Sequence, residues 1–143
     1  MQKRGIVLEK QIDAALPLVR VHGEAATCLL LTLLQNAVRF SPEGSKVELQ
    51  ARYDASSHRV TVEVRDHGPG VPSENREKIF EPFFTTAVDG LGMGLFVASR
   101  IADLQDIDLQ LMPTPPQGGA VFRVGFKEAA AEASEPAPVA AAV

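Results

Sequence analysis

The sequence predicts a single domain of the α/β class, in which helical segments alternate with strands. From Ala25 to Phe40 nearly every residue is apolar, over a length typical of a helix. Residues 47–53 and 60–64 alternate apolar with polar residues on either side of a turn, which is the pattern of a β-hairpin. A chain of 143 residues with 45% hydrophobic residues is long enough to bury one core.

Charge and apolar content exclude several functional classes. The formal net charge is −4 with both signs interspersed, so neither a nucleic-acid-binding face nor a polybasic membrane patch is indicated. The longest nearly apolar run, residues 25–34, is too short to span a bilayer, and no secretory segment opens the chain. We expect a cytoplasmic domain. Cys28 cannot form an intrachain disulfide and is expected to be a small buried hydrophobe, although a redox-sensing role stays open.

The long helix carries a polar stripe that admits two interpretations. Thr32, Gln35, Asn36 and Arg39 are spaced so that they fall on one face of a helix. A helix that is apolar on its other sides is expected to be buried, with this stripe facing something polar. Asn36 is either a core amide satisfied by backbone or, together with Arg39, part of a ligand pocket. The helix is expected to end two residues before Pro42, which disfavours helical geometry in its predecessor.

The hairpin also predicts a buried carboxylate. Val60, Val62 and Val64 are expected to face the core, and continuing the strand by two residues puts Asp66 on the same side. A buried carboxylate is costly unless hydrogen-bond donors reach it. The glycines in residues 67–71 (HGPGV) permit a tight turn or the close approach of a ligand. A strand-ending turn capped by Asp66 is the alternative.

Four further short strands complete the expected elements of the sheet. They are expected at positions 5–9, 16–21, 107–111 and 120–126, and apolar residues recur at every second position in the last two. The last two are expected to pair through the turn between them. The chain then continues without a pattern, rich in Ala, Glu and Pro, and is expected to be a disordered tail or linker.

An aromatic cluster and a glycine-rich loop lie between the hairpin and the last strands. Residues 73–79 are expected to form a short helix with Ser73 as its N-cap and Arg76 on its exposed side. Residues 80–84 (FEPFF) either anchor a loop or plug the core. Residues 85–91 carry no periodic signal and are expected to form a mobile loop.

The glycines of residues 90–94 (GLGMG) open a second helix with a mostly apolar stripe. Free backbone N–H groups and the positive end of the helix dipole favour an anion there, and phosphate is the expected ligand. The spacing fits neither the dinucleotide fingerprint of the Rossmann fold nor a phosphate-binding P-loop.

Four motifs in a fixed order carry a family resemblance. LLQNAVRFSP at residues 33–42 is similar to the family's N box, DHGPG at 66–70 to its first glycine box, FEPFF at 80–84 to its F box and GLGMG at 90–94 to its second glycine box. The sequence resembles the catalytic, ATP-binding domain of sensor histidine kinases. This domain belongs to the GHKL superfamily with the Bergerat fold, which also holds gyrase-type ATPases and MutL-like proteins. The resemblance runs from about Gly5 to Phe126.

The resemblance implies a two-layer α/β sandwich, a mixed sheet covered on one face by about three helices. ATP would lie between the long helix and the loop that precedes the second helix. Residues 1–126 would form the ATP-binding domain, followed by the tail or linker at residues 127–143. The parent protein would be a sensor, whether soluble or membrane-bound.

Roles for individual residues also follow from the resemblance. Asn36 would ligate Mg²⁺ through its side-chain oxygen, which is the ligand type that Mg²⁺ prefers. Arg39 would reach a phosphate, Phe40 would lie against adenine, and Asp66 would accept a hydrogen bond from the adenine amino group. The catalytic residues would be Asn36 and Arg39. The cofactor-binding residues would be Asn36, Arg39, Phe40, Asp66, Gly68, Gly70, Val71, Phe84, Thr85, Thr86, Gly90, Gly92, Met93, Gly94 and Leu95.

The implied reaction is transfer of the ATP γ-phosphoryl group to a histidine on a separate dimerisation domain, which serves a downstream response regulator. Phosphoryl transfer depends chiefly on positioning and on charge neutralisation by the metal, so this domain would supply ATP, Mg²⁺ and orientation. His22, His58 and His67 fall at strand or turn positions, and none stands on an acidic helical segment. We therefore predict that the chain does not autophosphorylate alone.

Three positions depart from the family pattern. Thr32 stands where kinases usually carry Asn and hydrolysing relatives carry Glu, so rapid ATP hydrolysis is not expected. Ala87 replaces a Lys that often follows the Thr-Thr pair, and Met93 replaces a Leu.

Two alternative functions stay open. One alternative is a degenerate or nucleotide-sensing module that binds ATP, or only a partner protein, without phosphotransfer. A serine kinase of the anti-sigma-factor type is another.

Overall fold

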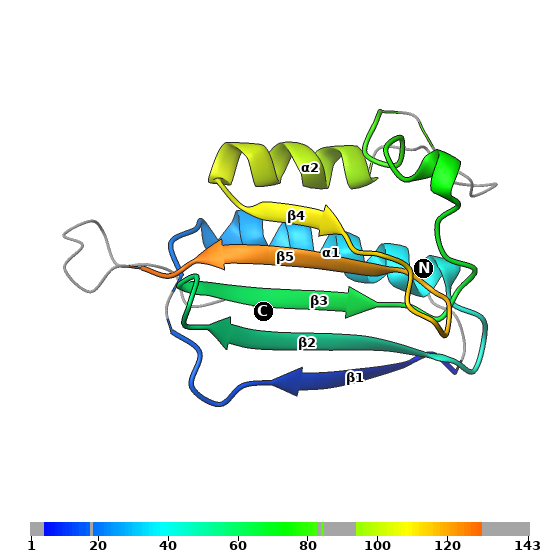
Figure 1. Cartoon of the computed structure of the whole chain (residues 1–143), viewed down its shortest axis with the longest axis horizontal. Helices are drawn as coiled ribbons and strands as arrows, with labels where there is room; N and C mark the ends of the chain where they lie inside the picture. The colour runs from blue at the N-terminus through cyan, green and yellow to red at the C-terminus, as the bar shows by residue number, and fades with distance from the viewer. Residues whose placement is uncertain (1–4, 18, 83, 85–93, 130–143) are drawn as a thin grey trace.

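The computed structural model describes residues 5–17, 19–82, 84 and 94–129. Figure 1 shows the order and placement of the elements. Along the chain they are β1 (Val7–Ile12), α1 (Gly23–Phe40), β2 (Lys46–Asp54), β3 (Arg59–Arg65), the 3₁₀ helix η1 (Ser73–Asn75), α2 (Gly94–Gln105), β4 (Asp108–Leu111) and β5 (Val121–Lys127).

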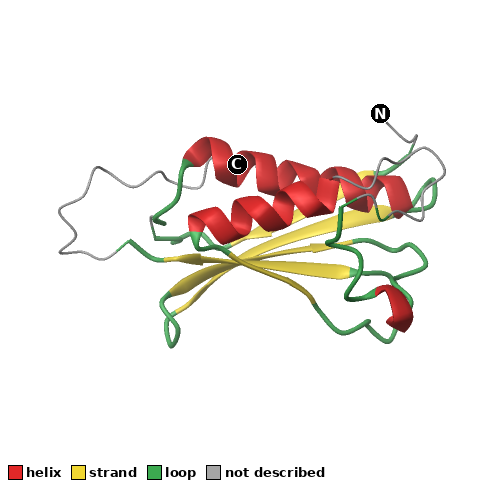
Figure 2. Ribbon diagram, turned by 90° about the horizontal axis from the view of Figure 1, so that it is seen from above, coloured by secondary structure: helices red, strands yellow, loops and turns green. Residues whose placement is uncertain are grey.

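The five strands form one mixed sheet in the order β1-β2-β3-β5-β4. β1 runs parallel to β2, whereas the other neighbouring pairs are antiparallel, including the predicted pair β4–β5. α1 and α2 pack side by side on one face of the sheet (Figure 2). The predicted two-layer sandwich is confirmed, with two α-helices and one 3₁₀ helix in the described residues. No helix in this part of the chain is long and apolar enough to cross a membrane.

The predicted hairpin is formed by β2 and β3, where Leu49 pairs with Val64. Val60, Val62 and Val64 are all buried, because successive strand residues alternate between the helix-covered face and the open face. Asp66 follows on the covered side and is 3% exposed. The prediction of a buried carboxylate at the end of this strand is therefore confirmed.

The prediction that α1 is buried on every side except one stripe is wrong. Leu29 and Leu33 are fully buried, whereas Leu31 is 50% exposed and Cys28 is also exposed. A helix in the outer layer of a two-layer fold turns only one side to the sheet, so its opposite side meets solvent whatever its composition. Cys28 is thus an exposed thiol and not the small buried hydrophobe that its neighbours in the sequence suggest.

The N-terminal strands also differ from the prediction. β1 starts two residues later than predicted and runs further along the chain. Residues 16–21 form no strand, and among those described only Val19 makes an isolated bridge, to Glu128. Pro17 has no N–H group to donate to a ladder, which works against a strand here. The division of the chain at residue 126 stays a prediction.

The segment that follows the first glycine motif is shorter and less exposed than predicted. Pro72, not Ser73, occupies the N-cap position of η1, and no side chain caps it. Arg76 is half-buried and donates hydrogen bonds to the carbonyl oxygens of Leu111 (3.2 Å) and Met112 (2.6 Å). Arg76 therefore ties this segment to the end of β4, since a guanidinium has several donors in a fixed geometry.

The aromatic cluster contributes to the core. Phe80 packs edge-on against Phe122 of β5, with ring centroids 6.2 Å apart and an angle of 87° between the rings. Phe84 is partly buried and also packs against the core. Phe83 lies outside the described residues. The interpretation that this cluster fills part of the core thus holds for Phe80.

Candidate functional site

The C-terminal end of α1 touches the loop that follows β3, backbone against backbone. A Cβ atom on Gly68 would lie 2.2 Å from the carbonyl oxygen of Phe40, which is far inside contact distance. Only glycine fits at position 68 without moving one of the two segments. The DHGPG loop is therefore held against the end of the helix that carries Asn36 and Arg39.

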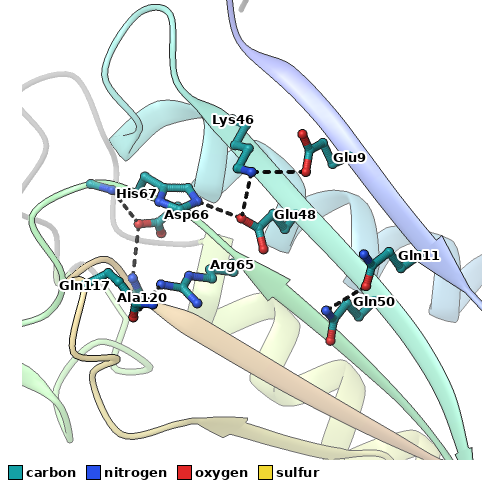
Figure 3. A network of polar contacts seen from close by, with 11 residues as sticks. Glu9, Gln11, Lys46, Glu48, Gln50, Arg65, Asp66, His67, Gln117 and Ala120 are labelled. Carbon is teal, nitrogen blue, oxygen red and sulfur yellow. Dashed lines mark hydrogen bonds and ion pairs between the residues drawn. The ribbon is translucent and has the colours of Figure 1, made fainter.

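Asp66 is a buried carboxylate with backbone donors on both sides (Figure 3). Its Oδ1 atom accepts hydrogen bonds from the N–H groups of Gly68 (2.9 Å) and Ala120 (3.2 Å). Burial raises the pKa of the Asp66 carboxyl above its ordinary value, although the two backbone hydrogen bonds act in the opposite direction. Among the described residues, both hydrogen bonds to this carboxylate go to the same oxygen, Oδ1.

The turn before β5 forms part of the same site, which the sequence analysis did not identify. Gly119 has a φ of +84°, and a Cβ atom there would lie 2.2 Å from the backbone oxygen of Asp66. A Cβ atom on Gly70 would in turn lie 3.0 Å from the oxygen of Gly119. The adjacent glycines 118 and 119 are the sequence signal that indicates such a close approach.

The start of α2 lies beside the middle of α1. A Cβ atom on Gly94 would lie 3.6 Å from Cγ2 of Thr32, an ordinary contact distance. Thr32 is half-buried and precedes Asn36 by one helical turn, and Asn36 and Arg39 are half-buried too. Gln35 is exposed, so the predicted polar stripe divides into one solvent-facing residue and three half-buried ones, of which Thr32 lies beside the start of α2.

The structure brings part of the candidate set together. The end of α1 contacts the DHGPG loop, and that loop contacts the turn before β5, whereas the start of α2 contacts the middle of α1. Val71, Phe84 and Leu95 are partly buried and pack against the core. The remaining candidates lie outside the described residues: Thr85, Thr86, Gly90, Gly92 and Met93.

The described residues restrict how a metal could be held. No group of three or more His, Cys, Asp or Glu side chains in this part of the chain is placed to bind an ion. The described side chains of these four types therefore do not form a metal site by themselves. Mg²⁺ is commonly bound with only one or two protein oxygens, and the amide oxygen of Asn36 is of the right type.

Comparison with known proteins gives the class of protein that this fold and site define. The family described as histidine kinase-, DNA gyrase B-, and HSP90-like ATPases matches residues 24–130, so the chain belongs to this family. The matched region includes both helices, the buried Asp66 and the turn before β5.

Within this family, proteins of similar sequence include sensor kinases. The chain is 34% identical over 119 residues to the adaptive-response sensory kinase SasA of Nostoc sp., covering 80% of this chain and 29% of the relative. It is 31% identical over 122 residues to the sensor protein kinase PilS of Pseudomonas aeruginosa, covering 83% of this chain and 23% of PilS. The chain spans about a third or less of the length of such relatives.

The solved structures that resemble this chain are also histidine kinases. The catalytic domain of histidine kinase ThkA superposes with a TM-score of 0.76 at 28% identity, covering 87% of this chain and 80% of that one. Full-length ShkA, solved in complex with AMPPNP, has a TM-score of 0.73 at 33% identity, covering 89% of this chain and 27% of ShkA. The chain is accordingly an ATP-binding catalytic domain of the sensor histidine kinase type.

Proposed function

We propose that this domain binds ATP with Mg²⁺ between α1 and the start of α2 and transfers the γ-phosphoryl group to a histidine on a separate dimerisation domain. That domain would then serve a response regulator. The observation that carries the proposal is the Asp66 carboxylate. It is buried and two backbone donors bind its Oδ1 atom, so its Oδ2 atom would be the one to recognise a donor on a ligand.

At the base end of the site, Asp66 would accept a hydrogen bond from the adenine amino group. A charged acceptor fixed by two backbone N–H groups needs no rearrangement when the base arrives, which favours binding. Phe40 is half-buried at the end of α1 and would lie against the adenine ring. Gly68 supports this arrangement, because its missing side chain lets the loop approach the carbonyl of Phe40.

At the phosphate end, Asn36 and Arg39 would act together. Arg39 lies nearly one turn beyond Asn36 on α1, so both side chains project from one side of the helix. Asn36 would hold Mg²⁺ through its amide oxygen, and Arg39 would bind a phosphate oxygen. When bound, Mg²⁺ neutralises charge on the phosphates. The protein's task is to position the nucleotide for an external nucleophile.

In the described part of the chain, the residue one turn before Asn36 is not a water-activating base. Thr32 lies one turn before Asn36, and a hydroxyl is a poor general base at neutral pH. His22 precedes α1, His58 lies in the turn between β2 and β3, and His67 contacts Glu48. None of the three histidines stands within a helix, which supports an acceptor histidine on another domain and slow hydrolysis by this one.

A test of the site is the Mg²⁺ dependence of ATP binding in Asn36→Ala. The substitution should weaken binding of ATP roughly tenfold or more in the presence of Mg²⁺, because the metal loses its protein ligand. Without Mg²⁺ the two proteins should bind ATP nearly equally. Isothermal titration calorimetry of both proteins, with Mg²⁺ and with EDTA, measures this difference.

The matched control for Asn36→Ala is Gln35→Ala, the exposed neighbour on the same helix. It should leave both affinities unchanged. Equal loss of binding with and without Mg²⁺ in Asn36→Ala would argue against a metal ligand. Absence of ATP binding by the unmodified chain would exclude the proposed site.

Phosphotransfer is tested separately from binding. Incubated alone with radiolabelled ATP, the chain should acquire no acid-labile phosphate. A histidine-containing dimerisation domain from one of the similar sensor kinases should become labelled when it is added. Acid-labile label on the chain alone would contradict the separation of the two domains. Binding of ATP without transfer to any such domain would favour a nucleotide-sensing module, and acid-stable label on a protein hydroxyl would favour a serine kinase.

A further inference from the structure

The two edges of the sheet differ in how their outward backbone groups are satisfied. β4 has four residues, and Arg76 donates hydrogen bonds to the carbonyl oxygens of Leu111 and Met112 at its end. β1 has six residues and forms the opposite edge, farthest from α2 in Figure 1. Among the described residues, no strand pairs with the outer side of β1. Such an edge presents N–H and C=O groups to which another strand can add.

The pairing of β1 with β2 determines which of its residues bond outwards. The N–H group of Val7 donates to the carbonyl oxygen of Ser45, so Val7 directs its backbone groups towards β2. Successive strand residues direct these groups to opposite edges, so Leu8, Lys10 and Ile12 direct theirs away from β2. A strand added antiparallel to β1 would therefore form its hydrogen bonds with these three residues.

The same three residues, here called the β1 row, have their side chains on the helix-covered side of the sheet. Each is in register with a buried residue of β2. α1 packs over β2 and β3, and Leu8 and Ile12 are still 45% and 53% exposed. Lys10 lies between them and is exposed, and none of the described residues forms an ion pair or hydrogen bond with its side chain. An apolar–basic–apolar row thus lies along the outer edge.

The polar side chains on the open face of β1 are already bound by β2 (Figure 3). Nζ of Lys46 lies 3.2 Å from Oε1 of Glu9. Nε2 of Gln50 donates to Oε1 of Gln11 at 3.0 Å. Selection of a partner strand at this edge therefore depends on the β1 row.

The charges of β1 disfavour a second copy of the chain as the partner. Because only the β1 row offers backbone groups to the edge, a two-fold antiparallel pairing that uses most of the strand centres on Glu9 or on Lys10. Either register sets two identical charges directly opposite each other, which destabilises the pair. Repulsion of this kind is a common means of excluding a wrong partner. A strand with an acidic residue opposite Lys10 would instead gain an attraction.

We propose that the outer edge of β1 binds an extended polypeptide segment from outside this domain, which adds antiparallel to the sheet and carries an acidic residue between two apolar ones. The acidic residue would lie opposite Lys10. The apolar residues two positions before and after it would lie opposite Ile12 and Leu8. Main-chain hydrogen bonds would supply affinity, and the alternate side chains would supply specificity. The proposal does not depend on the nucleotide site.

The probe is the peptide acetyl-Thr-Val-Thr-Glu-Thr-Val-Thr-amide, titrated into the isotope-labelled full chain and followed by NMR. The amide resonances of the β1 row should shift, and hydrogen exchange of these amides should slow. The same peptide with Lys in place of Glu should bind roughly three- to tenfold more weakly, because like charges then lie opposite. Lys10→Glu should reverse the preference between the two peptides. Lys78→Glu, the same change at an exposed residue after η1, is the matched control and should preserve it.

Methylated peptides test the register. An N-methyl group on the central Glu should abolish binding, because the N–H group of this residue faces β1. An N-methyl group on the Thr beside it points away from β1 and should change the affinity little. The reverse order of these two peptides, an unchanged preference in Lys10→Glu, or no shift of the β1 row at millimolar peptide would overturn the proposal. Self-association of the unmodified chain through β1, measured by sedimentation equilibrium, would overturn the choice of partner.

Discussion

Asp66→Asn is expected to weaken nucleotide binding by about a hundredfold while leaving the fold intact. The amide oxygen that replaces Oδ1 still accepts the hydrogen bonds from Gly68 and Ala120, so the loop keeps its shape. The amide nitrogen that replaces Oδ2 is a donor, and under the proposed function it would face the amino group of adenine donor to donor. Hydrogen bonds to charged groups contribute about 1.5–3 kcal/mol, which corresponds to a loss of roughly ten- to a hundredfold or more. Calorimetric titration with ATP measures the loss.

The same substitution has a predictable effect on the nucleotide-free domain. Burial raises the pKa of Asp66, so the folded domain binds this proton more tightly than the unfolded chain does. The contribution of Asp66 to the free energy of unfolding should then be largest below the ordinary carboxyl pKa and should decrease as pH rises through the raised pKa. Asp66→Asn should lack this decrease and be at least as stable as the unmodified protein at pH 7. Urea unfolding at several pH values measures the difference.

The exposed carboxylate at Asp108 on β4 provides the control, since Asp108→Asn should leave ATP affinity unchanged. Unimpaired binding by Asp66→Asn would remove the main support for the base site. A large loss of stability at neutral pH would show instead that the charge of Asp66 serves the fold.

Gly119→Ala is expected to destabilise the domain by about 3 kcal/mol or more. A Cβ atom there would lie 2.2 Å from the backbone oxygen of Asp66, and the φ of +84° disfavours any side chain. The left-handed conformation costs alanine about 1–2 kcal/mol, and overpacking against a rigid backbone adds roughly 1–3 kcal/mol. Thermal unfolding should show a decrease in Tm of roughly 10 °C or more.

The neighbouring Gly118 separates the two causes. It has a similar φ of +89°, but nothing lies within 4 Å of the position that its Cβ atom would take. Gly118→Ala should therefore show only the conformational cost, about 1–2 kcal/mol. If both variants lose the same stability, the close approach of the turn to Asp66 does not matter energetically.

The parts of the fold that depend on local patterns could be predicted from the sequence. The alternation of Val60, Val62 and Val64 predicts, without any knowledge of the family, that Asp66 lies in the interior. The structure confirms this prediction. The end of α1 at Phe40 follows from the effect of Pro42 on the residue before it. The pairing of β4 with β5 follows from the period-two alternation of apolar residues in both strands. Each of these features is decided within a short stretch of chain.

Features that depend on distant contacts could not be predicted. The donors to Asp66 include Ala120, which is 54 residues away and meets it only because β3 and β5 are antiparallel neighbours. The half-burial of Arg76 depends on the carbonyl groups at the end of β4. The exposure of Cys28 depends on α1 having the sheet on only one side, which composition does not reveal.

The backbone origin of the donors to Asp66 has a consequence for how this domain can change over evolution. Because N–H groups bind its Oδ1 atom, a substitution of the His67 side chain leaves both hydrogen bonds in place. The position between the carboxylate and Gly68 is therefore free to vary while the carboxylate keeps both donors. Such a position can acquire or lose a contact on the open face of the sheet in a single step, as His67 has with Glu48, while the carboxylate keeps its setting.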